Sequence, residues 1–329
     1  MIVTEIYKGQ GLGNQLFAYV MARVIALDNG YQFGIAHPEQ FKGGSFIKLD
    51  FGCRVQGGLV PYEGAIPTKL PDGILHYFRE ERLNHPNGTD IRSYDTGIKN
   101  IRDNTKIDGY FQGEDYFIHR KNEIREWLKV GAIDLPQNLC IINFRGGEYV
   151  GGNDLFLPLS YWHNAIKHMK SQIPAIQFKI VTDDIKTARK FFPEYEISHD
   201  MANDYISIQH AEYLILSNSS FAILPAWLNQ KVKKVIAPKY WARHNVSDGY
   251  WSLSYTIIRG WLYLDTSGKI YDYQSCVKER DEYMSKNRGL FWIGEPKPKE
   301  LTTWEEIKML IPKDVKKIIK KIIQKNERP

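Results

Sequence analysis

Ile2-Val3-Thr4-Glu5-Ile6-Tyr7-Lys8-Gly9-Gln10-Gly11-Leu12-Gly13-Asn14-Gln15-Leu16 is the stretch that decides the fold of this 329-residue chain. Its apolar start predicts a β-strand, and its three glycines predict a turn. Apolar residues then recur at helical spacing, which predicts a helix from about Asn14 to a stop at Gly30. Residues 31–35 return as a strand. A strand, a glycine turn, a helix and a strand in this order are typical of a parallel α/β sheet.

The glycine turn of residues 9–13 has two interpretations. Glycines let a ligand approach the backbone, and a helix start offers unpaired N–H groups to an anion. The dinucleotide fingerprint would need a glycine where Asn14 stands, and no Gly-Lys-Ser/Thr follows to make a phosphate-binding P-loop. A purely structural turn is therefore the alternative to an anion site.

A second run of alternating strands and helices begins near residue 107, after a stretch rich in turn residues from about 38 to 105 in which we expect loops and short elements. The best boundary is residues 132–137. With this length, two domains are expected. The prediction is an α/β fold with two Rossmann-like domains, residues 1–135 and 136–290, and a C-terminal extension, residues 291–329. In the second domain, strands are expected at 139–144, 178–182, 213–216 and 235–237, and helices at 161–169, 185–192, 204–211 and 221–228.

Composition points to a cytoplasmic protein. The three cysteines, Cys53, Cys140 and Cys276, are widely spaced and imply no disulfide framework, which fits a reducing compartment. The N-terminus lacks the basic start and apolar stretch of a signal peptide. No run of 18 or more apolar residues is present to span a bilayer.

The net charge of +6 is concentrated at the C-terminus. Residues 312–329 hold seven Lys/Arg and two Asp/Glu, so they contribute +5 and leave about +1 for the rest. A nucleic-acid partner is therefore not expected. Isoleucines at helical spacing among these lysines predict a basic amphipathic helix. That helix would lie on the cytoplasmic face of the inner membrane as a peripheral contact, or dock on the protein body.

Polar residues follow two strands of the second domain. Arg145 follows the strand 139–144 and enters a glycine turn, where an arginine can clamp a diphosphate, or form a structural ion pair with Glu148 or another carboxylate. Asp183 and Asp184 follow the next strand, and Asp184 is also a candidate helix cap. The chain contains no Asp-x-Asp, and its histidines show no metal-ligand spacing, so neither a metal nor another cofactor is expected.

Five ordered blocks of this sequence resemble glycosyltransferase family 11, the bacterial α-1,2-fucosyltransferases. They begin with the glycine turn and its continuation to Phe17, and end with the block before Trp241. The blocks are Gln10-Gly11-Leu12-Gly13-Asn14-Gln15-Leu16-Phe17, Gly109-Tyr110-Phe111-Gln112, Thr182-Asp183-Asp184, Leu216-Ser217-Asn218-Ser219-Ser220-Phe221 and Ile236-Ala237-Pro238-Lys239. The resemblance implies a GT-B fold, in which two Rossmann-like domains face each other across a cleft, and the N-terminal domain lies on the acceptor side.

The central block of that family is His-x-Arg-Arg-Gly-Asp-Tyr, and here it stands as Asn143-Phe144-Arg145-Gly146-Gly147-Glu148-Tyr149. The resemblance assigns Arg145 to the donor β-phosphate. The family's histidine helps to hold guanine or ribose, and Asn143 could take only part of that role. The differences from the family block therefore concern the identity of the donor. In the wider α-1,6- and protein O-fucosyltransferase group, an aspartate before a Ser-Ser pair contacts guanine, and Asp204 holds that position.

The resemblance further implies an inverting transfer, in which an acceptor hydroxyl attacks the anomeric carbon and GDP departs. Arg145 would neutralise the leaving phosphate, and Asp154 or Glu148 would be the general base. The expected donor-binding residues are Gly11, Gly13, Asn14, Gln15, Asn143, Asp183, Asp184, Asp204, Ser219 and Ser220.

Three functions follow as hypotheses. The first is transfer of fucose from GDP-fucose to a galactoside in the synthesis of a bacterial surface glycan such as O-antigen, with a lipid-linked acceptor if the C-terminal helix binds the membrane. The second is transfer of another sugar from a different nucleotide sugar. The third is a non-catalytic protein that binds nucleotides or glycans.

Overall fold

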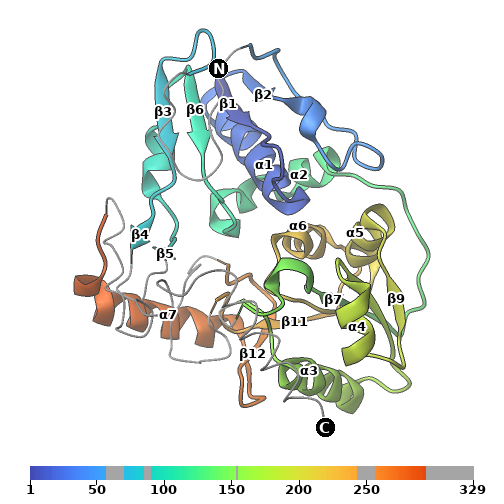
Figure 1. Cartoon of the computed structure of the whole chain (residues 1–329). Coiled ribbons are helices and arrows are strands. Elements are labelled where there is room, and N and C mark those ends of the chain that lie inside the picture. The colour runs from blue at the N-terminus through green and yellow to red at the C-terminus, as the bar shows by residue number, and fades with distance from the viewer. Residues whose placement is uncertain (57–69, 85–89, 153–154, 243–255, 294–329) are drawn as a thin grey trace, which may run out of the picture.

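The computed structural model describes residues 1–56, 70–84, 90–152, 155–242 and 256–293, and it contains two parallel β-sheets with helices around them (Figure 1). The predicted α/β class is confirmed. The C-terminal helix predicted over residues 312–329 lies outside the described residues, as does Asp154. In the part of the chain that the structure describes, no helix is both long and apolar enough to cross a membrane.

The first sheet has the strand order β2-β1-β6-β3, and its neighbouring strands are parallel. Its elements are β1 (Ile2–Glu5), α1 (Leu12–Asn29), β2 (Phe33–Ala36), β3 (His76–Arg79) and β6 (Thr105–Asp108). The helix ends as predicted, because Gly30 adopts the left-handed conformation that glycine tolerates best. A small antiparallel pair, β4 (Leu83–Asn84) and β5 (Asp90–Ile91), lies beyond β3, and α2 (Lys121–Trp127) leads toward the second sheet.

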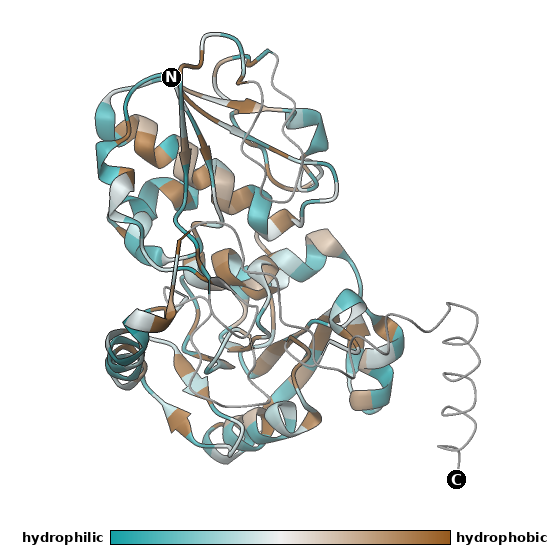
Figure 2. Ribbon diagram, turned by 60° about the vertical axis from the view of Figure 1, so that its left-hand side comes forward, coloured by the Kyte–Doolittle hydropathy of each residue, from teal (hydrophilic) through white to brown (hydrophobic). Residues whose placement is uncertain are grey.

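The second sheet has the order β13-β12-β11-β10-β7-β8-β9, in which only β13 is antiparallel to its neighbour. From β9 to β12 this is the strand order of a Rossmann sheet. The strands are β7 (Leu139–Phe144), β8 (Gln177–Thr182), β9 (Glu196–Ser198), β10 (Tyr213–Ile215), β11 (Lys234–Pro238), β12 (Leu262–Leu264) and β13 (Ile270–Tyr271). The helices are α3 (Leu159–Gln172), α4 (Ile185–Phe191), α5 (Met201–His210), α6 (Ser220–Leu228) and α7 (Tyr273–Asn287). Hydrophobic residues gather on the strands and the inward helix faces (Figure 2).

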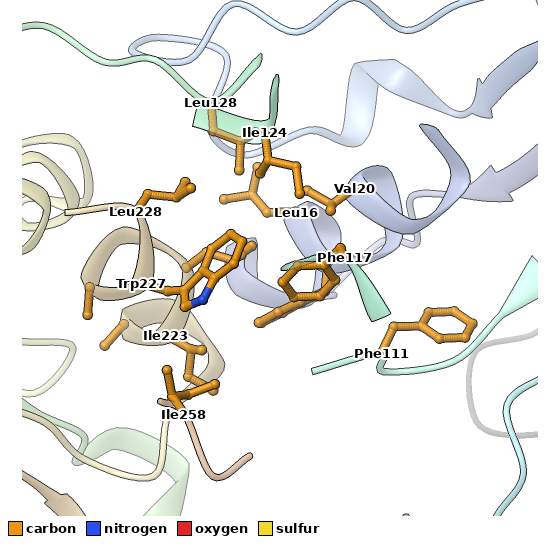
Figure 3. Packing of buried hydrophobic residues seen from close by; sticks show 14 of the residues in the cluster. Leu16, Val20, Phe111, Phe117, Ile124, Leu128, Ile223, Trp227, Leu228 and Ile258 are labelled. Carbon is orange, nitrogen blue, oxygen red and sulfur yellow. The ribbon is translucent and has the colours of Figure 1, made fainter. Parts of the chain in front are cut away.

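The two sheets share one hydrophobic core, which runs through helices α1, α2 and α6. Trp227 of α6 packs edge-on against Phe117 at a ring distance of 5.1 Å, and Leu16 and Ile124 lie close by (Figure 3). The core residues drawn there come from segments far apart in the sequence. Residues 132–137, predicted as a boundary, therefore connect two parts of the chain that both pack on this core, and a second cluster around Phe144 and Trp162 belongs to the second sheet alone.

A close backbone contact joins Gly13 of α1 to Ser220 at the start of α6. A Cβ atom at residue 13 would lie 2.3 Å from the carbonyl carbon of Ser220. Only glycine allows two helices to approach so closely. The contact brings the N-terminal ends of α1 and α6 together, although more than 200 residues separate them in the sequence.

A buried carboxylate ties the same region from the other side. Glu114 accepts hydrogen bonds from Trp227 Nε1 at 2.9 Å and from the Arg259 backbone N–H at 2.7 Å, and it pairs with the Arg259 guanidinium at 2.8 Å. The Glu114 side chain is only 3% exposed, whereas the Arg259 side chain is 46% exposed, so the carboxylate is the buried partner of this ion pair. Glu114 thereby holds residues 113–117 against both α6 and the segment before β12.

Candidate functional site

The candidate site begins where the second sheet reverses its strand order, between β7 and β10. Connections diverge from the carboxyl ends of these two neighbouring strands, which is the usual ligand-binding position in an open α/β sheet. Asn143 stands at the end of β7, and its Oδ1 accepts a hydrogen bond of 2.7 Å from the Ser217 hydroxyl, after β10. Both residues are buried, so the bond holds the two loops in register.

Arg145 lies in the loop that follows β7. Its Nη1 is 2.7 Å from Asp183 Oδ2, and its Nη2 is 2.8 Å from Glu148 Oε1. The guanidinium also lies over the Tyr149 ring, 5.0 Å from the centroid. The ion pair foreseen as an alternative is therefore present. The Arg145 side chain remains 28% exposed, so part of it is accessible to a ligand.

Asp183 and Asp184 support the arginine loop in different ways. Asp183 accepts a 2.9 Å hydrogen bond from the Gly146 N–H in addition to its ion pair with Arg145. Asp184 caps α4 by accepting from the Thr187 N–H at 3.0 Å and its hydroxyl at 2.6 Å. These bonds lower the pKa of Asp184 below its usual range. Asp184 is thus a helix cap, and whether it also contacts a donor stays a prediction.

The two glycines after Arg145 are explained by crowding. A Cβ at residue 146 would lie 2.6 Å from the Cβ of Asp184, and one at residue 147 would lie 2.4 Å from Asp183 Oδ2. Gly147 also has a positive φ of 44°, which favours glycine. The second arginine of the family block therefore has no room at residue 146.

The N-terminal ends of α1 and α6 meet shortly after the carboxyl end of β10. At α6, Ser219 is the N-cap residue and forms no side-chain capping hydrogen bond, and Ser220 begins the helix. At α1, Gly11 is the N-cap and offers no side chain. Two helix ends in contact, with no acidic residue in either first turn, provide the positive dipole ends and N–H groups that bind anions.

Two predicted donor ligands have their polar atoms engaged within the protein. The Gln15 amide donates to the carbonyl of Gln40 at 3.0 Å and accepts from the Lys42 N–H at 3.0 Å, so it holds the loop after β2. Asp204 accepts from the Ser198 hydroxyl and from the Asp200 N–H. Burial raises the pKa of Asp204. Their contacts with a nucleotide remain predictions.

The block 109–112 resembles a family signature, but the sequence predicts no role for its individual residues. The buried Glu80 carboxylate organises it, accepting from the Tyr110 N–H at 2.8 Å and from the Phe111 N–H at 3.2 Å. Glu80 thereby fixes the backbone of this block beside β6.

A second polar cluster lies at the carboxyl ends of β1 and β6. Lys106 is fully buried, and its Nζ is 2.7 Å from Asp108 Oδ2 and 3.1 Å from the Tyr7 hydroxyl. The Tyr7 hydroxyl in turn donates to Asp108 Oδ1 at 2.7 Å. Glu5 stands 3.5 Å from Lys106, and burial raises the pKa of this carboxyl. The buried charges are thus paired, and Asp108 retains a side chain that is 15% exposed at the edge of the sheet.

Across the described ranges, no three His, Cys, Asp or Glu side chains lie together in a way that would hold a metal ion. The predicted general base Asp154 lies outside those ranges. The other candidate, Glu148, is strongly exposed beside Arg145.

Comparison with known proteins finds relatives at low sequence identity. No protein-family model matches the chain. It is 27% identical over 158 residues to an α-1,2-colitosyltransferase of Escherichia coli, a match that spans 40% of this chain and about half, 54%, of that relative. It is 23% identical over 290 residues to the O-antigen biosynthesis glycosyltransferase WbnK of Escherichia coli, over 71% of this chain and 93% of that protein. The resemblance to glycosyltransferase family 11 is confirmed. Both relatives are glycosyltransferases by name.

Proposed function

We propose that this chain is an inverting glycosyltransferase of the GT-B type that uses a sugar nucleotide without a metal. Its most suitable donor is GDP-fucose, and its acceptor is a galactoside hydroxyl in a bacterial surface glycan, joined through an α-1,2 linkage. The observation that carries the proposal is the position of Arg145, which follows β7 at the switch point of the second sheet and has a partly exposed side chain.

In the proposed reaction, the acceptor hydroxyl oxygen attacks the anomeric carbon while the bond from that carbon to the diphosphate oxygen breaks. Negative charge grows on the departing diphosphate. A guanidinium already held in place by Asp183 needs little reorganisation to meet that charge, which is the condition for large electrostatic stabilisation. The N-terminal ends of α1 and α6 would add backbone N–H groups for the same anion.

The acceptor proton needs a base. Glu148 is exposed and 2.8 Å from Arg145, so it would become available when a diphosphate replaces it as the arginine's partner. Asp154 is the other candidate from the sequence. The polar edge formed by Tyr7, Lys106 and Asp108 lies on the acceptor side of the proposed arrangement, and its partly exposed carboxylate suits sugar hydroxyls.

A specific observation favours a second candidate, transfer of a sugar other than fucose. One relative is named for colitose transfer, and residues 143 and 146 depart from the family's central block. A direct assay is the release of GDP from GDP-fucose and from GDP-colitose, with and without galactoside acceptors. Acceptor-dependent release from GDP-fucose supports the first proposal, and release from GDP-colitose alone supports the second. Binding without turnover across a broad set of acceptors would instead indicate a non-catalytic nucleotide- or glycan-binding protein.

Arg145→Ala is the matched test of the site. We expect a loss on the order of 10²–10³ in rate, the cost of removing one preorganised stabiliser. Arg189→Ala is a suitable control, because Arg189 lies in the last turn of α4 and has no ion pair within the described residues. Normal turnover in the Arg145 variant would remove the basis of the proposal.

The C-terminal segment 312–329 is proposed to hold the chain on the cytoplasmic face of the membrane, close to a lipid-linked acceptor. The support is its charge of +5 and its isoleucine stripe. Deleting it should abolish binding to vesicles that contain anionic lipid and leave turnover of a water-soluble acceptor unchanged. Equal vesicle binding with and without the segment would contradict this role.

A further inference from the structure

Asn14 is the third residue of α1 and directly follows Gly13, the residue that contacts α6. The N-cap residue before it, Gly11, has no side chain to satisfy the first N–H groups, and no acidic residue lies in the first turn. An anion bound at this helix end would therefore meet both backbone N–H groups and the side chain of Asn14. Because an amide has a donor end and an acceptor end, its orientation decides whether it attracts or repels that anion.

Gln112 determines this orientation. Its Nε2 donates a 2.9 Å hydrogen bond to Asn14 Oδ1. With its oxygen turned toward Gln112, Asn14 has its amide nitrogen, the donor end, left for another partner. Gln112 itself is only 3% exposed, so water does not compete for this contact.

The other end of the Gln112 amide shows that the arrangement has a cost. Its Oε1 is buried and has no hydrogen-bond partner among the described residues. An unpaired buried acceptor is unfavourable and needs an explanation. If the Gln112 amide were turned round, its oxygen would face the oxygen of Asn14. The present orientation of Gln112 therefore leaves its own Oε1 unpaired and keeps the amide of Asn14 in one orientation.

The loop that carries Gln112 is held rigidly. Glu80, whose side chain is fully buried, accepts from the N–H groups of Tyr110 and Phe111 and from the Tyr116 hydroxyl. Phe111 is held at a positive φ of 48°, which is unfavourable for a bulky residue. A loop fixed in this way presents the Gln112 amide in one position.

We propose that Gln112 is a positioning residue that turns the amide N–H₂ of Asn14 toward a diphosphate oxygen of the nucleotide-sugar donor. The inference rests on the proposed function, since it needs a donor diphosphate at the start of α1. Gln112 acts through Asn14 and does not itself contact the donor.

Gln112→Met is the deciding variant, because methionine has a similar length and carries neither the donor N–H nor the unpaired oxygen. We expect the affinity for GDP-fucose to fall roughly threefold to tenfold, the effect of one hydrogen bond. The melting temperature should not fall, because the buried unpaired oxygen is removed together with the hydrogen bond. A merely structural role for Gln112 predicts the reverse: a lower melting temperature and unchanged affinity.

Gln209→Met provides the control. The Oε1 of Gln209 in α5 is also buried without a partner in the described residues, so the same chemical change is made away from Asn14, and affinity should not change. Asn14→Asp keeps an oxygen for Gln112 but loses the donor N–H. The double variant Gln112→Met/Asn14→Asp should then lose little more affinity than Asn14→Asp alone, because one interaction is removed twice.

The outcomes separate this inference from the proposed function. If the wild-type chain binds neither GDP-fucose nor GDP-colitose by calorimetry, the proposed function fails and the inference with it. If the wild type binds a donor and Gln112→Met binds it equally well, only the inference fails. Additive losses in the double variant would also overturn it.

Discussion

Replacing Gly13 by alanine should disturb both the stability and the activity of the chain. The new Cβ would lie 2.3 Å from the carbonyl carbon, 2.4 Å from the carbonyl oxygen of Ser220 and 2.6 Å from the nitrogen of Phe221. All three are backbone atoms that cannot rotate away. To reach an ordinary contact of 3.4 Å or more, the ends of α1 and α6 must separate by roughly 1 Å.

The expected magnitude follows from two opposing effects. Overpacking of this kind costs about 1–3 kcal/mol, and alanine regains up to about 1 kcal/mol over glycine inside a helix. A net loss of about 1–2 kcal/mol in the free energy of unfolding should lower the melting temperature by roughly 2–6 °C. Because the separated helix ends carry Asn14 and Ser220, turnover should fall further, up to about a hundredfold for a displacement of 1 Å.

Thermal unfolding and GDP release measure the two effects on the same preparations. Gly131→Ala is the matched control, because a Cβ there meets no atom within 4 Å and Gly131 has no positive φ. It should change neither turnover nor, beyond about 1 kcal/mol, stability. If Gly13→Ala matched this control in both assays, the close helix contact would not be a structural constraint, and the reasoning would be refuted.

Three further predictions concern other parts of the fold. Glu114→Gln removes a buried charge that serves Trp227 and Arg259, so chemical denaturation should show a loss of about 2–4 kcal/mol, whereas Asp115→Asn at the exposed end of the same arginine should cost under about 1 kcal/mol. Asp184→Ala should lose about 1 kcal/mol of unfolding free energy at pH 7, and Asp184→Asn should keep the cap. Because folding lowers the pKa of Asp184, the stabilisation by its carboxylate is present above the pKa of the unfolded state and is lost as the pH falls through the pKa of the folded state. The unfolding free energies of the wild type and the Asn variant, measured against pH, should therefore converge in acid. A maleimide at neutral pH should label Cys53 first, since burial raises the pKa of the other two thiols; early labelling of all three by mass spectrometry would contradict this.

Regular apolar patterns made much of the fold predictable from the sequence. The strand β7 is found at the predicted residues, and α1 ends at the predicted Gly30. The strand β6 was missed because it carries Lys106, which is buried only because Asp108 and Glu5 lie beside it. Likewise α7 buries little besides Cys276, so its polar sequence lacks an apolar stripe. Pairing between distant charges is not visible in local periodicity.

The sequence predicts the site residues that directly follow strands, but not the residues that hold the site in place through contacts with distant segments. Arg145 follows β7 as expected, and Asp184 had been recognised as a candidate cap. The buried carboxylates Glu80 and Glu114 were not singled out, because a glutamate in a loop is usually solvated. Only the three-dimensional contacts show that they hold the block 109–116 in place.

The shared core of α1, α2 and α6 limits how the molecule can move. With Gly13 seated on the Ser220 backbone and Phe46 packed 5.5 Å from Tyr205, the two sheets are fastened together at several places around the proposed anion site. Wide hinge opening at these places would expose apolar side chains to water, which is strongly unfavourable. Cutting the chain near Pro136 should therefore yield two fragments that aggregate rather than two active halves.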